Sequence, residues 1–354
     1  MIAEPLPSAV EPDRLTEVFG RAGGLQRGRV SNVEVLHSRT TVLSRITRLR
    51  ITHEGNVSGA PSSLILKTGL PERVGNASWD AGRQEVAFYT DVAAAMLGVL
   101  VPRCFEATWD AETRAWHLLL EDLTDSHFTA TVWPLPPGLD QCRTIIRARA
   151  RFQSTWWDHP RLGVSIGTWV DDEGIDRNLQ RFDEQFGIFA DRVGDQLSRE
   201  RRNLFDRLIA EGSRLSTRYR SHRHMTIVQG DAHFWNCFLP RDAGDDIRFF
   251  DWDCWRADIA ADDLAYMLAM HWYPERRRLM ERSLLDCYHT ALLEQGVRGY
   301  DRQALDDDYR LSVLWQIATP VWQANANIPP VIWWNNLERI MLAVDDLGCR
   351  DLLA

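Results

Sequence analysis

The sequence predicts an α+β fold, with a sheet-forming N-terminal third and a mainly helical remainder. Apolar and β-branched residues alternate along the first part of the chain, as in strands, and from about residue 139 the apolar spacing becomes helical. A chain of 354 residues is also too long for one compact core. We therefore expect two lobes, residues 1–122 and 123–354, divided near Glu121–Thr124.

The N-terminal lobe is expected to consist of strands around one helix. Period-two alternation predicts the first two strands, and a short apolar run that includes Lys67 predicts the third. Apolar residues at helical spacing predict a helix that carries Glu85 in its first turn. Two further strands would form a hairpin around a polar turn. We expect strands at residues 31–37, 42–54, 63–69, 103–110 and 115–123, and the helix at 82–98.

The C-terminal lobe is expected to be helical, with one interruption. Helical spacing covers residues 139–158 and 178–219 and resumes at residue 262. Two short apolar segments, near residues 227–240 and 247–256, predict strands between these helical regions.

Composition narrows the possible partners. The chain is 45% apolar and 26% charged, with a formal charge of −9 and no long basic run, which argues against nucleic acid and is compatible with a cationic small molecule. No apolar run approaches the roughly 18 residues of a membrane span, and the first residues lack the pattern of a secretory signal. The six cysteines form no CxxC pair. We expect a cytoplasmic protein without a membrane partner.

Polar residues occur in an order that suits phosphoryl transfer. Lys67 ends an apolar strand, Glu85 begins the next helix, Asp231 and Asn236 lie in the stretch IVQGDAHFWNCFLP, and Asp251 follows another apolar strand. In such a site a lysine neutralises nucleotide phosphates, a glutamate holds the lysine, and an aspartate takes or orients the acceptor proton. An amide and a second carboxylate hold Mg²⁺.

The spacing of the last three residues fits this chemistry. Asp231 and Asn236 are five residues apart, so one tight loop can present both. The fifteen residues from Asn236 to Asp251 are enough for a hairpin that returns the chain to its starting point. Such a hairpin would supply the oxygen ligands that a hard cation prefers.

With these residues in this order, the chain resembles the aminoglycoside phosphotransferase family, within the protein-kinase-like fold. The motif GDAHFWN is most similar to the ecdysteroid-kinase-like and choline-kinase-like branch. The segments QEVAFY, LLLEDL and DDLAYML also resemble that group. The resemblance extends from about Asn32 to the end. It implies a two-lobe fold with a small antiparallel-sheet lobe and one helix, and a larger helical lobe. It also implies transfer of the γ-phosphoryl group of ATP, or of GTP, to a hydroxyl of a small molecule.

The resemblance implies a role for each matching residue. Lys67 would contact the nucleotide phosphates and pair with Glu85. Asp231 would be the catalytic base, and Asn236 and Asp251 would hold Mg²⁺.

Further matches concern the nucleotide and the catalytic loop. Backbone groups at Glu121 and Leu123 would meet the adenine, and Asp263 would brace the catalytic loop. Gln229 stands where the family often has histidine. The phosphate-covering loop would lie within residues 37–45, where there is no glycine, so that phosphate would meet backbone amides and the hydroxyls of Ser38, Thr40 and Thr41.

The acceptor cannot be identified from the sequence. An antibiotic, an amine alcohol, a sugar and a sterol-like alcohol all remain open, as does the oligomeric state. Asp253 is a substrate or metal contact, or a solvated or arginine-paired carboxylate. His233 shapes the loop, binds metal, carries a proton or contacts the substrate. Acidic residues and tryptophans could together form a pocket for a cation. The candidates for this pocket are Asp253, Asp258, Asp262, Trp333 and Trp334, although helix packing explains the tryptophans equally well.

Two other functions compete with the kinase interpretation. A metal-dependent hydrolase could use the nearby residues His222, His224, Asp231, His233 and Asp251 to bind metal and activate water. Such an enzyme would not need Lys67 and Glu85. A non-catalytic nucleotide-binding relative is the second alternative, and the glycine-free loop is its only support.

Overall fold

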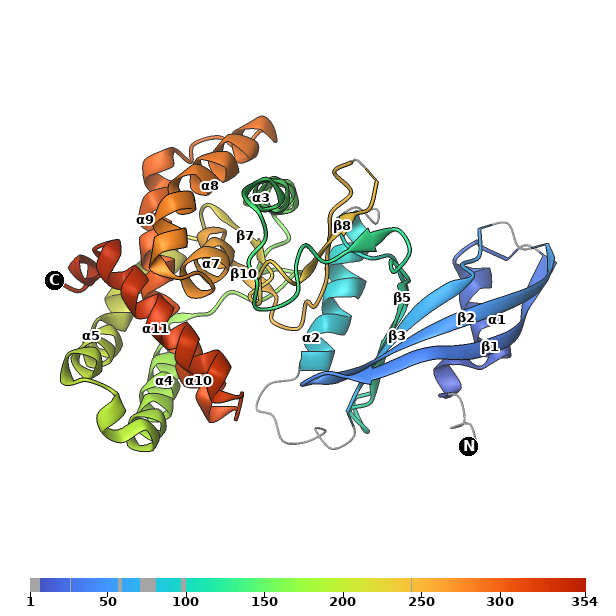
Figure 1. The fold of residues 1–354 in the computed structure, drawn as a ribbon, viewed down its shortest axis with the longest axis horizontal. Coiled ribbons are helices and arrows are strands. Elements are labelled where there is room, and N and C mark those ends of the chain that lie inside the picture. The colour runs from blue at the N-terminus through green and yellow to red at the C-terminus, as the bar shows by residue number, and fades with distance from the viewer. Residues whose placement is uncertain (1–6, 26, 57–58, 71–80, 97–99, 243) are drawn as a thin grey trace. The chain divides into compact units, whose positions relative to one another are not determined.

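The computed structural model describes residues 7–354 except 26, 57–58, 71–80, 97–99 and 243, and the chain divides into two compact units (Figure 1). Unit 1 contains Met1–Thr129 and Cys237–Cys254; unit 2 contains Ala130–Asn236 and Trp255–Ala354. The first unit thus includes a hairpin from much later in the chain. The lobe boundary after residue 122 stays a prediction. The α+β fold class is confirmed.

Unit 1 is built on a five-stranded antiparallel sheet in the order β1-β2-β3-β5-β4. On β3 the side chains alternate between the two faces, so Leu64 and Leu66 share one face and Lys67 lies on the other. In the register, Lys67 pairs with Ile46 on β2 and Leu118 on β5. The strands are β1 Arg27–Thr40, β2 Ser44–Asn56, β3 Ser63–Gly69, β4 Cys104–Trp109 and β5 Trp116–Glu121.

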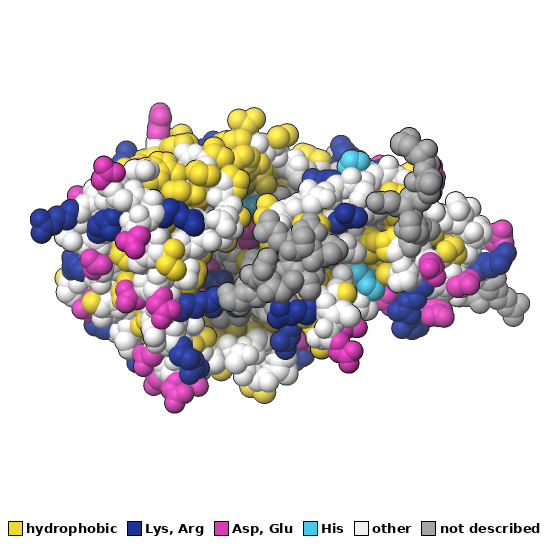
Figure 2. Space-filling view, turned by 90° about the horizontal axis from the view of Figure 1, so that it is seen from below, with side chains coloured by type: hydrophobic (Ala, Val, Ile, Leu, Met, Phe, Trp, Pro, Cys, Tyr) yellow, Lys and Arg dark blue, Asp and Glu magenta, His cyan; other side chains and the backbone are white. Residues whose placement is uncertain are grey.

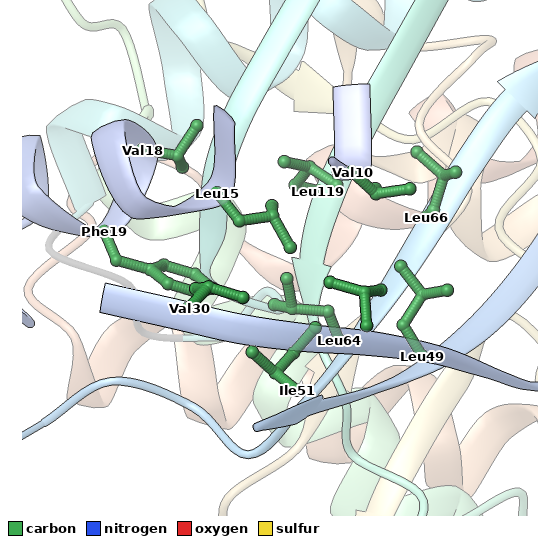
Figure 3. Close-up of a cluster of buried hydrophobic side chains, with 11 residues drawn as sticks. Val10, Leu15, Val18, Phe19, Val30, Leu49, Ile51, Leu64, Leu66 and Leu119 are labelled. Carbon is green, nitrogen blue, oxygen red and sulfur yellow. The ribbon is translucent and has the colours of Figure 1, made fainter. Parts of the chain in front are cut away.

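One face of this sheet is covered by α1 (Pro12–Arg21), which the sequence reading missed. Its apolar residues Leu15, Val18 and Phe19 have the i, i+3, i+4 spacing of one helix face, and Pro12 stands in the first turn, where its missing N–H is tolerated. They pack on sheet residues in a buried cluster, shown in Figure 3. The cluster comprises Val10, Leu15, Val18, Phe19, Val30, Val33, Leu49, Ile51, Leu64, Leu66 and Leu119.

The one helix predicted for this lobe is present but changes its winding. It begins as α2 (Ala81–Ala87), continues as a π-helical stretch at Phe88–Val92 and ends as a 3₁₀ stretch at Ala93–Met96. The predicted end at residues 97–98 lies outside the described residues. Glu85 lies on α2 and is buried.

A small second sheet in unit 1 contains the predicted hairpin. Its strands are β6 His127–Phe128, β8 Cys237–Pro240 and β9 Arg248–Phe249, in the order β6-β8-β9. Cys237 pairs with Phe249, so β8 begins where β9 ends. Asp251 follows β9 by two residues.

Unit 2 is mainly helical, with one two-stranded antiparallel sheet. That sheet pairs β7 (Met225–Val228) with β10 (Arg256–Ile259). The helices are α3 Leu139–Thr155, α4 Asp172–Val193, α5 Arg199–Leu215, α6 Thr217–Arg220, α7 Ala261–Leu264, α8 Pro274–Glu294, α9 Arg302–Trp315, α10 Ala318–Asn325 and α11 Pro330–Asp346. Shorter turns are the 3₁₀ segments Ser8–Val10 in unit 1 and Gly194–Gln196 and Cys349–Leu353 in unit 2, and a π-helical stretch, η6, at Ala265–Met270.

The surface shows mixed charge. On the face in Figure 2, acidic and basic side chains are interspersed rather than gathered by sign. Among the helices formed by the described residues, none has both the length and the apolar composition needed to cross a membrane.

Candidate active site

Lys67, Glu85 and Asp251 form a compact charged group in unit 1, called here the lysine cluster. The Lys67 Nζ lies 2.7 Å from Glu85 Oε2 and 2.6 Å from Asp251 Oδ1. Lys67 is 8% exposed and Glu85 is 1% exposed, whereas the Asp251 side chain is 38% exposed. The structure therefore brings together three residues that are 18 and 184 positions apart in the sequence.

The charge balance of the lysine cluster is negative. Burial alone would lower the pKa of Lys67, but the carboxylates of Glu85, Asp251 and Asp253 outweigh it and raise the pKa above its ordinary value. Lys67 is therefore charged at neutral pH. Burial raises the pKa of Glu85, against the opposing effect of Lys67. One ammonium group faces more than one carboxylate, which is an environment suited to a divalent cation.

Lys67 also has a sequence property that motif reading overlooked. The sequence contains 41 lysine and arginine residues, and Lys67 is the only lysine among them. An ammonium group is a compact point charge on a flexible stem, whereas a guanidinium group is a planar fork, so the two side chains are not interchangeable. The chain therefore places its single ammonium side chain at this buried position.

Asp251 is held by its neighbour Trp252. Asp251 has a φ of 67°, in the left-handed region that non-glycine residues seldom adopt. Trp252 is fully buried, its ring stacks on Phe88 at 3.9 Å and 6°, and its indole N–H donates to the carbonyl of Phe249. A backbone hydrogen bond from Trp252 also reaches Glu85. The helix that carries Glu85 and Phe88 thus fixes the backbone around Asp251.

The predicted base, Asp231, lies in a loop of unit 2 after β7. Gly230 precedes it with a φ of 80°, a conformation that glycine adopts without strain. The Tyr266 hydroxyl donates to Asp231 Oδ1 at 2.6 Å, and the Asn236 amide nitrogen donates to Oδ2 at 3.0 Å and to the Asp231 carbonyl at 3.0 Å. Both bonds of Asn236 come from its amide nitrogen, so its amide oxygen remains a suitable ligand for a hard cation.

A buried network of hydrogen bonds holds the backbone of this loop. The Asp263 carboxylate accepts from the backbone N–H of Gln229 at 3.0 Å and of Gly230 at 3.0 Å. Arg149, which is fully buried, donates to Asp263 at 3.2 Å and to the Gln229 side chain at 2.6 Å. Gln153 donates to the same Asp263 oxygen. These contacts match the bracing role expected for Asp263 and give Gln229 a definite partner.

His233 belongs to a cluster of rings beside Asp231. Its Nε2 is 3.5 Å from Asp231 Oδ2, and its ring lies 5.5 Å from Trp235, 6.5 Å from Tyr266 and 5.5 Å from His271. Burial lowers the pKa of His271 well below its ordinary value, with His233 adding to the shift, so His271 is neutral. The packing supports a loop-shaping role for His233; its role as a proton carrier stays a prediction.

The predicted phosphate loop is the hairpin between β1 and β2. The Ser38 and Thr47 hydroxyls are 3.1 Å apart, and the Thr41 hydroxyl donates to the Ser44 carbonyl at 3.0 Å. These hydroxyls therefore stabilise the hairpin itself. Thr40 is exposed at the end of β1. Phosphate contact by the three residues stays a prediction.

The predicted adenine-binding segment follows β5. The Glu121 backbone N–H donates to the Arg103 carbonyl at 2.8 Å, and the Leu123 carbonyl accepts from His127 at 2.8 Å. No acceptor for the Leu123 backbone N–H occurs among the residues that the structure describes. This N–H is therefore a suitable donor for a ring nitrogen of a nucleotide base.

The proposed acidic pocket is less acidic than the sequence suggests. Arg256 pairs with Asp258 at 2.7 Å and with Asp262 at 2.5 Å, so two carboxylates share one guanidinium group. Burial, with the neighbouring Asp262, raises the pKa of Asp258 to about 6 against the effect of Arg256. Asp253 is buried in unit 1, where it adds negative charge near Lys67.

The two predicted tryptophans lie on α11. Trp333 is buried and packs edge-on against Phe189 of α4 at 5.7 Å, which supports the helix-packing interpretation for this residue. Trp334 is partly exposed and contacts Trp333 at 5.6 Å. Substrate contact by Trp334 stays a prediction.

The site residues fall into two groups that belong to different units. Lys67, Glu85 and Asp251 meet in unit 1, and Asp231 and Asn236 meet in unit 2. Asn236 is the last residue of its segment of unit 2, and the next residue begins the unit 1 hairpin. A shared magnesium site of Asn236 and Asp251 stays a prediction.

The histidines of the hydrolase alternative have other environments. His222 stacks on Trp169 at 4.4 Å and 11°, and His224 packs against Tyr300 at 5.2 Å. Within the described part of the chain, no three His, Cys, Asp or Glu side chains are grouped so as to hold a metal ion. The hydrolase interpretation is not favoured.

Sequence reasoning missed Tyr266 and Arg149. Tyr266 follows Asp263 by three residues. On a helix, this spacing places both side chains on the same face, so the position of Asp263 could have indicated Tyr266. Arg149 lies on a helix rich in arginine, and no pattern distinguishes the buried one from the exposed ones.

Comparisons with known proteins agree with this arrangement. The model of the ecdysteroid kinase-like family matches residues 170–297, a range that includes Asp231, Asn236 and Asp251. No curated protein is similar enough in sequence to match the chain.

Several solved structures share the fold. A candidate aminoglycoside phosphotransferase from Ralstonia eutropha JMP134 aligns with a TM-score of 0.58 and 12% identity, covering 96% of this chain and 98% of that one. Choline kinase from Cryptosporidium parvum Iowa II aligns with a TM-score of 0.54 and 10% identity, covering 90% and 92%. Amicoumacin kinase, solved with AMP-PNP and Ca²⁺, aligns with a TM-score of 0.52 and 14% identity, covering 93% and 92%. The fold is protein-kinase-like, and the predicted resemblance to small-molecule kinases of this fold is confirmed.

Proposed function

We propose that this protein transfers the γ-phosphoryl group of ATP, or of GTP, to a hydroxyl group of a small molecule. The lysine cluster carries the proposal, because a charged lysine held between two carboxylates is what a nucleotide site needs to neutralise phosphate. The choline, aminoglycoside and amicoumacin kinases named above act on small molecules, and one of them was solved with a nucleotide analogue and a divalent cation.

Asp231 would orient the acceptor hydroxyl and accept its proton. Neutral donors, Tyr266 and Asn236, hold the carboxylate without cancelling its charge. In a loose phosphoryl-transfer transition state, positioning of the nucleophile matters more than strong basicity. A carboxylate fixed in this way is suited to that task.

The donor set fits Mg²⁺, because carboxylate and amide oxygens are its preferred protein ligands. Asp251 and Asn236 would hold the ion, with Asp253 adding negative charge near Lys67. When bound, the ion would neutralise negative charge on the nucleotide phosphates. Lys67 would contact the same phosphates, and the Leu123 N–H would bind the base.

The acceptor class stays open, and a cytoplasmic location is part of the proposal. Because Arg256 offsets one of the two negative charges of Asp258 and Asp262, these residues support a cationic acceptor less strongly than their number in the sequence suggests. Uncharged alcohols therefore belong in any substrate screen beside amine alcohols.

A screen of acceptors would test the proposal. Purified protein would be incubated with Mg²⁺ and ATP or GTP together with amine alcohols, aminoglycosides, sugars and sterol-like alcohols, and ADP or GDP release would be measured with the phosphorylated product. We expect acceptor-dependent turnover that falls about 10³-fold in Asp231→Asn, the order of a general-base contribution. Asp176→Asn, an exposed aspartate on α4, is the control.

Three outcomes would separate the alternatives. Tightly bound zinc at one ion per chain, without use of ATP, would support the hydrolase. ATP binding without turnover for any acceptor would support a non-catalytic relative. Full turnover in Asp231→Asn would refute the assignment of the base.

A further inference from the structure

We propose that Tyr266 is a positioning residue for Asp231, and that Asp263 and Tyr266 together clamp the catalytic loop through its backbone and its side chain. This inference rests on the proposed function, in which Asp231 orients the acceptor. Both Asp231 oxygens are engaged, Oδ1 by the Tyr266 hydroxyl at 2.6 Å and Oδ2 by the Asn236 amide at 3.0 Å. Together the two donors determine the rotation of the carboxylate.

The clamp comes from a single turn of helix. Asp263 and Tyr266 are three residues apart, the spacing at which helical side chains lie on the same face. Asp263 accepts hydrogen bonds from the backbone at Gln229 and Gly230, and Tyr266 reaches the side chain of the next residue, Asp231. One helix segment therefore controls both where the loop lies and where its carboxylate points.

The backbone at this turn departs from regular α-helix. The α-helix ends at Leu264, and residues Ala265–Met270 are π-helical. Such stretches are rare and are frequent at functional sites. Tyr266 lies in the first turn of this stretch and is 7% exposed.

Ring packing directs the Tyr266 hydroxyl. The tyrosine ring lies 5.0 Å from His271 and 6.5 Å from His233. A phenylalanine at this position would keep these ring contacts and lose only the hydroxyl. The substitution therefore separates the contribution of the hydroxyl from the ring packing of the cluster.

Loss of the hydroxyl should affect the chemical step rather than nucleotide binding. Without its partner at Oδ1, the carboxylate gains rotational freedom, and small errors in positioning a nucleophile lower rates strongly. The residues proposed to contact the nucleotide lie in unit 1, which does not contain Tyr266. A positioning role therefore predicts a lower kcat with an unchanged KM for ATP.

The test compares Tyr266→Phe with Tyr309→Phe. Tyr309 is a matched control, because its buried hydroxyl also donates to a carboxylate, Glu281, at 2.7 Å, and this carboxylate lies on α8 rather than in the catalytic loop. We expect kcat to fall about tenfold in Tyr266→Phe, with the same KM for ATP, and to be unchanged in Tyr309→Phe. Wild-type kcat in Tyr266→Phe, or an effect confined to KM, would overturn the inference.

A second measurement needs no turnover and separates this inference from the proposed function. Thermal midpoints would be measured for the wild type, Tyr266→Phe, Asp231→Ala and the double variant. A real hydrogen bond makes the two shifts non-additive, because the second substitution finds the bond already lost. Additive shifts would overturn the clamp even if the protein is a kinase. Non-additive shifts in a protein that phosphorylates no acceptor would support the clamp and refute the proposed function.

Discussion

The lysine cluster and the catalytic loop hold their key side chains in opposite ways. In the lysine cluster, charged partners surround Lys67 within 2.6–2.8 Å. In the catalytic loop, neutral donors hold Asp231. The Arg149–Asp263 charge pair meets the backbone of the preceding residues, Gln229 and Gly230, through Asp263 rather than the Asp231 carboxylate. One region surrounds its key side chain with opposite charge; the other holds its key side chain with neutral donors.

This difference follows from what each region would do. A lysine that is to meet phosphate must stay protonated, and nearby carboxylates ensure this. A carboxylate that is to receive a proton would lose that ability beside a full positive charge, since an opposite charge stabilises its ionised form. Separating the bracing charge pair from the reacting carboxylate meets both requirements.

The largest expected effect is on the brace of the catalytic loop. Arg149→Met should lower the free energy of unfolding by about 4 kcal/mol, because it leaves the Asp263 carboxylate buried without its cation. Urea denaturation would measure the change. Arg147→Met is the control on the same helix, since its pair with Glu294 is about half exposed and should contribute less than about 1 kcal/mol.

Equal effects of these two substitutions would break the comparison. They would mean that the bracing pair behaves as a surface pair, and that the backbone hydrogen bonds at Asp263 alone hold the loop.

The next effect concerns the only lysine. Lys67→Arg keeps the charge but replaces a point charge, which lies 2.7 Å from Glu85 and 2.6 Å from Asp251, with a planar fork of different geometry. We expect kcat/KM for ATP to fall about 100-fold, or about 2.7 kcal/mol, within the range for loss of one preorganised donor. Steady-state kinetics with varied ATP would measure it. An unchanged kcat/KM would show that charge alone is required.

The absence of other lysines provides a second measurement on the same residue. Amine acylation followed by peptide mapping can report on Lys67 without interference from another lysine side chain. Because its pKa is raised and it is buried, Lys67 should react more slowly at pH 8 than the lysine of a short reference peptide. Equal acylation rates for Lys67 and the reference peptide would show that Glu85 and Asp251 do not protect the Lys67 ammonium group when the protein is in solution.

The sequence could predict the parts of the site that follow chain order. Lys67 on its strand, Glu85 on the next helix and the hairpin that leads to Asp251 all follow from local periodicity and spacing. Phosphate contact by Ser38 and Thr41 was a weaker prediction, because a hydroxyl near a turn bonds locally as readily as it binds a ligand.

Other parts of the site depend on tertiary packing that one sequence does not display. Arg149 meets Gln229 across 80 residues, and Trp252 stacks on Phe88 across a still longer separation. Arg149 resembles its exposed neighbours on α3 in sequence, and burial alone distinguishes it. Helix α1, which was not predicted, is a different case, because its apolar spacing and Pro12 were sufficient to predict it.

The smallest effect concerns a charge pair of intermediate burial, Arg48 with Asp122 in unit 1. The Asp122 side chain is 1% exposed and accepts from Arg48 at 2.6 Å and from Thr124 at 2.6 Å. Burial would raise the pKa of Asp122, but the hydrogen bonds from Thr124 and Arg48 hold it below its ordinary value of 3.8. A lowered folded pKa means that the ionised pair stabilises the protein above the unfolded pKa and stops doing so as the pH falls through the folded pKa.

Asp122→Asn should therefore lower the free energy of unfolding by about 1.5 kcal/mol at pH 7, the usual contribution of a hydrogen bond to a charged group. The difference in unfolding free energy between Asp122→Asn and the wild type should be constant down to about pH 5. It should shrink below pH 3.8, the ordinary pKa of an aspartate, as Asp122 of the wild type becomes protonated. Urea denaturation between pH 7 and pH 3 would measure it, with Glu34→Gln in the exposed pair with Arg50 as the control. A difference that does not shrink at all between pH 5 and pH 3 would assign the effect to packing rather than to charge, and would place this pair outside the electrostatic contrast between the two regions.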